Sequence, residues 1–358
     1  MAPDGGSAVL RLNPAGTGGT LRLEDLIAAP LDGLAALIRQ IVGESVEPPW
    51  PPLLRAPHRS WNYSAYPLLL SLVGLGKKRT PGTDASDPAP AVTPGALEQA
   101  FAWWDDTAVV AAQAFRSAVI VNFALAAVAV SLAALSLFAG GAKWIFVLAE
   151  VVTIMLLLGN TTLAGRRRWQ ERWLESREVA ELLRVCLMLR KVGVQGLEAA
   201  DLSDADLASR DLVARISDQA AWNEATAHRM HLAGHRIERF GETLFVLVLA
   251  AAISWLILRL ADPHAAHTLT YALTAVTAGL PAVATASYGI GVILDFEGIA
   301  DRSGRMAAAL RSSLAGWDPS RANVAELQGA ARVTADIMLG DVAAWRLLAQ
   351  GRRLKIPG

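Results

Sequence analysis

The sequence predicts an all-α, polytopic membrane protein with four transmembrane helices in two hairpins and long cytoplasmic helical extensions. Of its 358 residues, 53% are hydrophobic and 18% are charged, whereas soluble domains typically carry about 25% charged residues. Four segments come close to the roughly 20 apolar residues that a helix needs to cross a bilayer. Basic residues flank these segments mostly on one side. These observations decide the fold class.

The four predicted spans differ in how apolar they are. The first contains no charge, the second carries one acid, Glu150, and the third has one base near its end, Arg259. The fourth is the weakest because it contains Thr, Gly and Pro281, so we expect protein rather than lipid to surround it. The spans cover residues 117–139, 143–160, 243–261 and 270–294.

Charge placement predicts the orientation of the spans. The links at 140–142 and 262–269 are too short to hold a domain, so each pair of spans forms a hairpin. Lys and Arg gather at the other ends of the spans, and clusters of this kind mark the cytoplasmic side. The basic residues in question are Lys77, Lys78, Arg79, Arg116, Arg166, Arg167, Arg168, Arg172, Arg229, Arg236, Arg239, Arg302, Arg305 and Arg311. We therefore expect a multi-pass protein with both termini in the cytoplasm, and the single cysteine, Cys186, fits a reducing compartment.

Four regions follow along the chain. The first, residues 1–94, is a cytoplasmic N-terminal region, partly disordered and rich in proline. The second, 95–210, holds the first transmembrane hairpin and a cytoplasmic helix. The third, 211–320, holds a cytoplasmic helix and the second hairpin, and the fourth, 321–358, is a C-terminal cytoplasmic helix.

Finer predictions concern the segments outside the spans. Residues 1–20 look disordered, and 21–42 read as a helix interrupted at proline. The apolar segment 66–75 is too short to cross and either lies on the membrane or packs on the helices. After the second span, apolar residues recur every three or four positions, which predicts a helix that continues without a break through Arg190.

A weak internal repeat accompanies the two hairpins. A shift of 127 residues places the first span on the third and the second on the fourth, and it aligns Leu183-Arg184 with Leu310-Arg311. Either a hairpin and its following helix are duplicated, or the match arises by chance, since identity is otherwise low.

Four residues in the spans are candidates for a pore or a gate: Glu150, Arg259, Asn122 and Pro281. A charge near mid-bilayer costs about 2.5–3.5 kcal/mol and usually faces the bundle or water. Glu150 and Arg259 both lie in the outer half and could pair; alternatively, Glu150 is protonated or hydrogen-bonded and Arg259 snorkels outward. Asn122 could bond between helices, and Pro281 could kink the fourth span.

The arginines after the second span predict a membrane-interface anchor, because cations meet anionic headgroups and indoles sit at the boundary. A dedicated lipid or nucleotide site is the alternative. The anchor residues are Arg166, Arg167, Arg168, Trp169 and Trp173.

No motif in the sequence predicts catalysis. His228, His231 and His235 share a helix face, but metal binding would need further ligands, so we expect a solvated face. No catalytic motif is recognisable, and neither a cofactor nor a metal is expected. The zero net charge gives no sign of nucleic-acid binding.

The run from Phe115 to Arg190 carries a family resemblance. Its residues are Phe115-Arg116-Ser117, Asn122, Glu150, Arg166-Arg167-Arg168-Trp169, Glu171-Arg172-Trp173, Arg177, Ala180-Glu181 and Leu183-Arg184. This pattern resembles the SMODS- and SLOG-associating two-transmembrane effectors, the SLATT group, over roughly residues 95–350. No SLOG-type nucleotide-binding domain is present, since the glycines at 16, 18 and 19 stand in no βαβ unit.

The resemblance implies a non-enzymatic effector of a bacterial conflict or defence system, in the inner membrane, that forms pores or perturbs the bilayer. Its partners would be the lipid bilayer, further copies in a homo-oligomer, and a separate nucleotide-sensing protein. The alternatives are a regulated ion channel or small transporter, and a membrane-anchored scaffold for a cytoplasmic partner.

Overall fold

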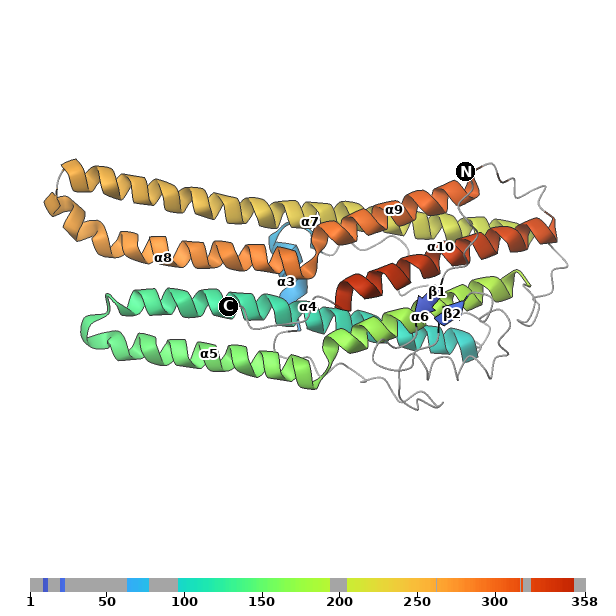
Figure 1. The fold of residues 1–358 in the computed structure, drawn as a ribbon, viewed down its shortest axis with the longest axis horizontal. Coiled ribbons are helices and arrows are strands. Elements are labelled where there is room, and N and C mark those ends of the chain that lie inside the picture. Colours follow the sequence, from blue (N-terminus) through green and yellow to red (C-terminus); the bar gives the residue numbers. More distant parts are fainter. Residues whose placement is uncertain are drawn as a thin grey trace.

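The computed structural model describes residues 9–11, 20–22, 63–76, 96–193, 205–261, 263–315, 317 and 323–350. Over these residues the chain is helical apart from one short strand pair, as the sequence predicts (Figure 1). The elements are β1 (Val9–Arg11), β2 (Thr20–Arg22), α3 (Ala65–Leu72), α4 (Ala96–Ser136), the 3₁₀ turn η1 (Gly140–Ala142), α5 (Lys143–Arg166), α6 (Trp169–Lys191), α7 (Ala205–Ala261), α8 (Pro263–Leu294), α9 (Phe296–Leu314) and α10 (Val324–Gln350).

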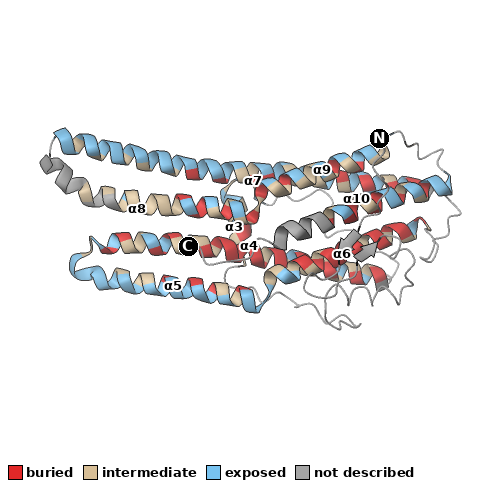
Figure 2. Ribbon diagram, in the orientation of Figure 1, coloured by how far each residue is buried: buried red, intermediate tan, exposed pale blue. Residues whose placement is uncertain are grey.

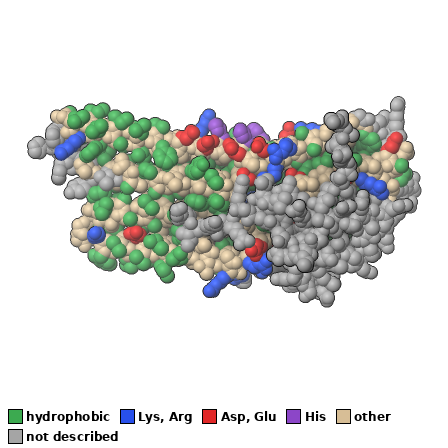
Figure 3. Space-filling model, viewed as in Figure 1, with side chains coloured by type: hydrophobic (Ala, Val, Ile, Leu, Met, Phe, Trp, Pro, Cys, Tyr) green, Lys and Arg blue, Asp and Glu red, His purple; other side chains and the backbone are tan. Residues whose placement is uncertain are grey.

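Four helices are long and apolar enough to cross a membrane, which confirms the predicted spans at this level. Their apolar parts lie side by side in one layer in the order α7, α8, α4, α5 (Figure 1). We call this layer, residues 117–166 and 239–294, the apolar half. Figure 3 shows hydrophobic side chains covering this end of the molecule, while acidic, basic and histidine side chains gather beside it.

The inner and outer helices of the layer differ in exposure. α4 and α8 each pack on two neighbours, whereas α5 and α7 form the free edges and are largely exposed there (Figure 2). The expectation that protein shields the fourth span fits the inner place of α8, although α4 is the more deeply buried helix.

The remaining helical segments form what we call the base: residues 96–116, 169–193, 205–238, 296–315 and 323–350. All of them lie at the same end of the layer, opposite the tips of both hairpins (Figure 1). Their core is a cluster of buried apolar side chains from α4, α6, α7, α9 and α10, including Leu182, Leu183, Leu212, Leu310 and Leu327.

Asn122 contributes to the contact between α4 and α5. It is fully buried and donates to the Thr161 hydroxyl at 2.8 Å, while its carbonyl accepts from the Asn160 amide at 2.7 Å. Asn160 also donates to the Ala118 carbonyl at 3.0 Å. These bonds satisfy polar groups that would otherwise be costly inside an apolar layer.

The helix after the second span is not continuous, so that prediction is wrong. α5 ends at Arg166 and α6 begins at Trp169, with Arg168 between them in the left-handed conformation (φ 50°). The break lets the chain change direction, so that the buried face of α6 packs on α4 and α10 (Figure 1). The periodic apolar pattern marks a helix face, and it is equally compatible with one helix or two.

Two further predictions need correction. The expected link at 262–269 is mostly helix, because α8 begins at Pro263, a residue whose fixed φ suits the first turn. Near the N-terminus, Val9–Arg11 and Thr20–Arg22 form an antiparallel pair with Leu10 opposite Leu21. This contradicts disorder at 9–11 and at Thr20, and helix at 21–22. The rest of the segments 1–20 and 21–42 lies outside the described residues.

The short apolar segment near residue 70 packs on the helices rather than lying apart from them. Tyr66 of α3 is buried beside α4, and its backbone N–H donates to the Ser117 hydroxyl at 3.1 Å. The Ser117 hydroxyl in turn donates to the Tyr63 carbonyl at 2.9 Å. One of the two predicted alternatives is therefore realised.

The described helices include two three-helix units with the same pattern of contacts, unit one (α4, α5, α6) and unit two (α7, α8, α9). In each unit the first helix packs on both the second and the third: α4 on α5 and α6, and α7 on α8 and α9. Arg168 and Asp295, 127 positions apart, precede the third helices, and they are the two non-glycine residues with positive φ in the described chain.

An ion pair recurs at the same place in both units. Arg184 of α6 pairs with Asp105 of α4 at 3.3 Å, and Arg311 of α9 pairs with Glu224 of α7 at 3.2 Å. The two arginines are 127 positions apart, but the two acids are only 119 apart. The second unit therefore has eight more residues between its paired acid and arginine, and its hairpin reaches further from the base (Figure 1). The recurring ion pair favours the repeat over a chance match, but the single 127-residue shift does not align the first helices.

Candidate functional site

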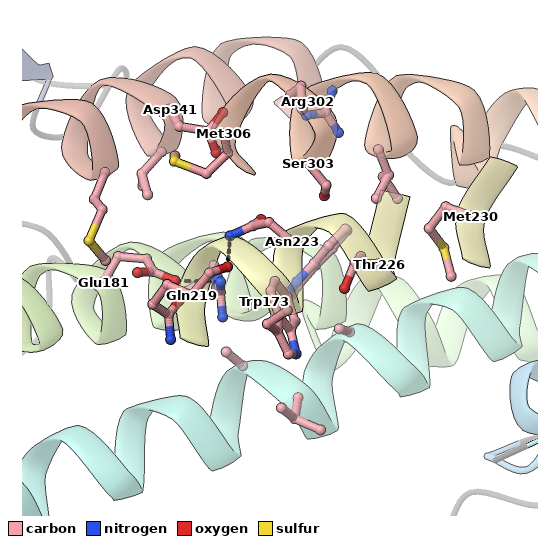
Figure 4. A pocket seen from close by; sticks show the side chains of 18 of the residues that line it. Trp173, Glu181, Gln219, Asn223, Thr226, Met230, Arg302, Ser303, Met306 and Asp341 are labelled. Carbon is pink, nitrogen blue, oxygen red and sulfur yellow. Dashed lines mark hydrogen bonds and ion pairs between the residues drawn. The ribbon is translucent and has the colours of Figure 1, made fainter. Parts of the chain in front are cut away.

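A cavity of about 410 Å³ opens in the base, just beside the apolar half, between the two three-helix units (Figure 4). This volume is typical of a small-ligand pocket. Its wall takes side chains from α3, α4 and α6 on one side and from α7, α9 and α10 on the other. The polar and aromatic lining residues are Tyr66, Gln113, Arg116, Trp173, Arg177, Glu181, Arg184, Gln219, Trp222, Asn223, Thr226, Arg302, Ser303 and Asp341.

Helical spacing brings the charged residues of α6 onto one face. Arg177, Glu181 and Arg184 lie at positions i, i+4 and i+7, which point the same way on an α-helix. The Glu181 side chain is 5% exposed and accepts from both arginines, at 2.7 Å from Arg184. Asp105 of α4 lies 3.6 Å from Arg177 and 3.3 Å from Arg184. Two acids and two bases thus form one network, and three of its members, Arg177, Glu181 and Arg184, line the cavity.

Arg116 sits differently from the other arginines of the cavity. Its guanidinium lies 5.1 Å from the centre of the Tyr66 ring and 5.1 Å from that of Trp173. Among the described residues, no carboxylate forms an ion pair with it. Two aromatic faces can hold a cation in this way while leaving its N–H donors available.

Asp341 of α10 closes the cavity opposite α6 (Figure 4). Burial raises the pKa of its carboxyl, and the nearby charge of Glu181 adds to the increase. Three positive charges nearby lower the pKa of this carboxyl but do not cancel the increase; they belong to Arg302, Arg177 and Arg305. The carboxyl is therefore easier to protonate than an exposed aspartate.

We expect Asp341→Asn to raise the melting temperature near neutral pH. In the wild type, a carboxyl whose folded pKa is raised destabilises the fold once it is ionised. Its contribution to stability therefore declines as the pH rises from the ordinary aspartate pKa through the raised one. The asparagine amide has the same shape and stays neutral, so the variant does not lose this stability as the pH rises.

The measurement is the melting temperature of both proteins in detergent across acidic to neutral pH, with Asp218→Asn on the exposed face of α7 as the control. The difference between wild type and Asp341→Asn should shrink at acidic pH. A constant difference at every pH would show that the carboxyl's ionisation is not the cause.

The structure separates the predicted pore residues. Glu150 lies half-buried on α5, and Arg259 is exposed on α7, at the opposite edge of the layer. The two therefore do not pair within one chain. Among the described residues, Glu150 has no hydrogen-bond or ion-pair partner. Pro281 lies inside α8, which remains one helix around it.

The predicted anchor divides in two at the helix break. Arg166, Arg167 and Arg168 are exposed where the apolar half meets the base, and Arg168 pairs with Glu171 and, at 3.6 Å, with Glu175. Trp169 and Trp173 instead turn inward. Trp173 stacks on Phe115, with ring centres 5.7 Å apart, and forms part of the cavity wall.

Sequence reasoning missed the cavity. Its residues come from six separate helices, so no local spacing reveals them. One available signal was the pair of arginines with Glu181 on the otherwise apolar face of α6, since charges on a buried face need partners.

Comparison with protein-family models, curated proteins and solved structures finds no match for this chain. In the described part of the chain, no group of three or more metal-binding side chains comes together. The rings of His231 and His235 stack on the exposed side of α7, with their centres 6.2 Å apart. What the chain does must be argued from the layer, the base and the cavity.

Proposed function

We propose that this protein is a non-enzymatic membrane effector whose base controls whether its apolar half opens or perturbs a lipid bilayer. The observation that carries this proposal is the position of the cavity. It lies between the two units, and α4 and α7 run without a break from its wall into the apolar layer. Binding or release of a ligand in the cavity would therefore change the angle and distance between the two hairpins.

The setting follows from the sequence. The basic residues beside the base and the resemblance to SLATT effectors favour a bacterial inner membrane, with the base and both termini in the cytoplasm. A separate nucleotide-sensing protein is the partner that we propose as the source of the signal, with arginines and aromatic side chains of the cavity exposed to whatever the signal delivers.

Induced expression in bacteria, with membrane potential followed by a fluorescent dye, tests this function. We expect wild-type protein to depolarise the cells and arrest growth, and Glu150→Ala to weaken both effects, because the partnerless carboxylate of α5 is removed from the layer. Asp218→Ala, an exposed change in the base, is the control and should act like the wild type.

A normal potential at high expression, also with the native neighbouring genes present, would contradict the proposal. In that case, a scaffold function would require Glu150→Ala to be silent and charge reversals along α6 or α7 to abolish partner binding. A regulated channel or transporter would show a substrate-dependent current without growth arrest.

A further inference from the structure

The order of helices in the apolar half leaves two complementary edges free. Within the chain, the first helix of unit one, α4, packs against the second helix of unit two, α8. The exposed edges are therefore the second helix of unit one, α5, and the first helix of unit two, α7 (Figure 2). Because the units share one fold, these edges are the counterparts of α8 and α4, the two helices that already contact each other.

The internal contact is close and involves small residues. A Cβ atom placed on Gly279 would lie 3.9 Å from the Cβ of Ser131, and one on Gly289 would meet the Phe123 ring. The α4 residues Phe123 and Ser131 are eight positions apart and share one helix face. This contact is an example of how the first helix of one unit packs on the second helix of the other.

The counterpart residues on the free edges are exposed. The offset is 119 positions from α4 to α7, so Ser131 corresponds to Ala250. It is 127 positions from α5 to α8, so Gly279 corresponds to Val152. Ala250 is exposed, and Val152 is 50% exposed. Gly159, the counterpart of the buried Ala286, has no neighbouring atom within 4 Å of an added Cβ. The two edges thus present the positions that form the internal contact, with other side chains, and have nothing packed on them in the described chain.

Charge on the two edges is complementary where the layer meets the base. Glu242 on α7 corresponds to Phe123, and Arg166 on α5 corresponds to Ile293, one turn from Gly289. Both charged residues are exposed. Glu238 and Arg239, also exposed, lie one turn before Glu242 on α7. A copy placed by the internal contact would bring Glu242 of one chain beside Arg166 of the next.

We propose that copies of this chain assemble head to tail within the membrane, with the α7 edge of one copy against the α5 edge of the next, repeating the contact of α4 with α8. Such a heterologous interface builds a ring when its rotation closes. The assembly requires that the four helices cross the membrane, and it does not depend on whether they open it.

Disulfide cross-linking between copies tests the interface. The Cβ separation of Ser131 and a Cβ on Gly279 matches that of a disulfide, about 3.8 Å. We therefore expect Ala250→Cys chains, mixed in the membrane with Val152→Cys chains of a different tag, to give cross-linked dimers under a lipid-soluble oxidant. The native Cys186 is fully buried in the base and should not compete.

The matched control uses Ala252→Cys with Ile154→Cys, exposed residues two positions further on that point away from the proposed interface. We expect about tenfold more dimer from the test pair than from this control, because disulfide geometry is strict. One chain carrying Ser131→Cys and Gly279→Cys should form an internal disulfide, which verifies that the layer is folded.

Charge reversal gives an independent readout. Glu242→Arg or Arg166→Glu alone should lower the dimer yield and the assembly mass in native mass spectrometry, and the two changes together should restore both. The proposal fails if the test pair gives no more dimer than the control pair while the internal disulfide forms, or if the wild type is monomeric in native mass spectrometry and reversals change nothing. Membrane potential enters neither measurement, so a failed pore would leave these outcomes readable.

Discussion

Replacing Gly289 by alanine should destabilise the protein by about 1–3 kcal/mol, the usual cost of forcing extra volume into a packed core. An added Cβ would lie 2.6 and 2.9 Å from two atoms of the Phe123 ring and closer still to a third, its Cε1. The partly buried ring lies against α8, so an added methyl group would push on the contact between the two units. The measurement is thermal or denaturant unfolding in detergent.

Two variants make this test specific. Gly291→Ala lies two positions further along α8, where an added Cβ meets nothing within 4 Å. It should be neutral or slightly stabilising, because alanine is the better helix former. Combining Gly289→Ala with Phe123→Leu should recover part of the loss. Equal destabilisation by Gly289→Ala and Gly291→Ala would show that helix flexibility, not the Phe123 contact, is what matters.

Glu181→Ala should cost about 3–5 kcal/mol, the range expected when one partner of a buried ion-pair network is removed. Glu181 is 5% exposed and holds Arg177 and Arg184, which are 29% and 23% exposed. Without it, Asp105 would be the one carboxylate of the described residues that forms an ion pair with both guanidinium groups. The change should therefore also loosen α6 from α4 at the cavity wall.

The control for this prediction is an exposed pair of the same chemistry. Asp211 and Arg215 lie at i, i+4 on α7, and each is 48% exposed. Asp211→Ala should change stability by less than about 1 kcal/mol, because solvent screens exposed pairs. If both substitutions cost the same, then burial of the Glu181 network contributes nothing.

The sequence was most informative where one physical rule acts locally. Bilayer thickness requires a run of apolar residues, so all four spans, including the one with Glu150 and the one with Arg259, could be placed without a structure. The hairpins followed from link length alone. Helix ends were harder: the break at Arg168 and the helical start at Pro263 depend on how α6 and α8 pack.

Contacts between distant segments could not be read from the sequence. The cavity joins Arg116 with Trp173, Asp341 and Arg302, residues whose spacing carries no pattern. The recurring ion pairs were hidden for a different reason. An eight-residue difference between the paired acid and arginine of the two units changes the offset from 119 to 127, so one fixed shift aligns Arg184 with Arg311 but not Asp105 with Glu224.

α7 has 57 residues without a break, which makes it about 85 Å long at 1.5 Å per residue. Residue 240 divides it into a base segment of about 52 Å and an apolar segment of about 32 Å, at the same rise per residue. A tilt of about 5° about residue 240 would move the far end of the apolar segment, about 30 Å away, by roughly 2.5–3 Å, since helix rise fixes the arm length. That displacement is comparable to the width of a water molecule, so under the proposed function a small rearrangement around the cavity would be geometrically sufficient to change what passes beside the spans.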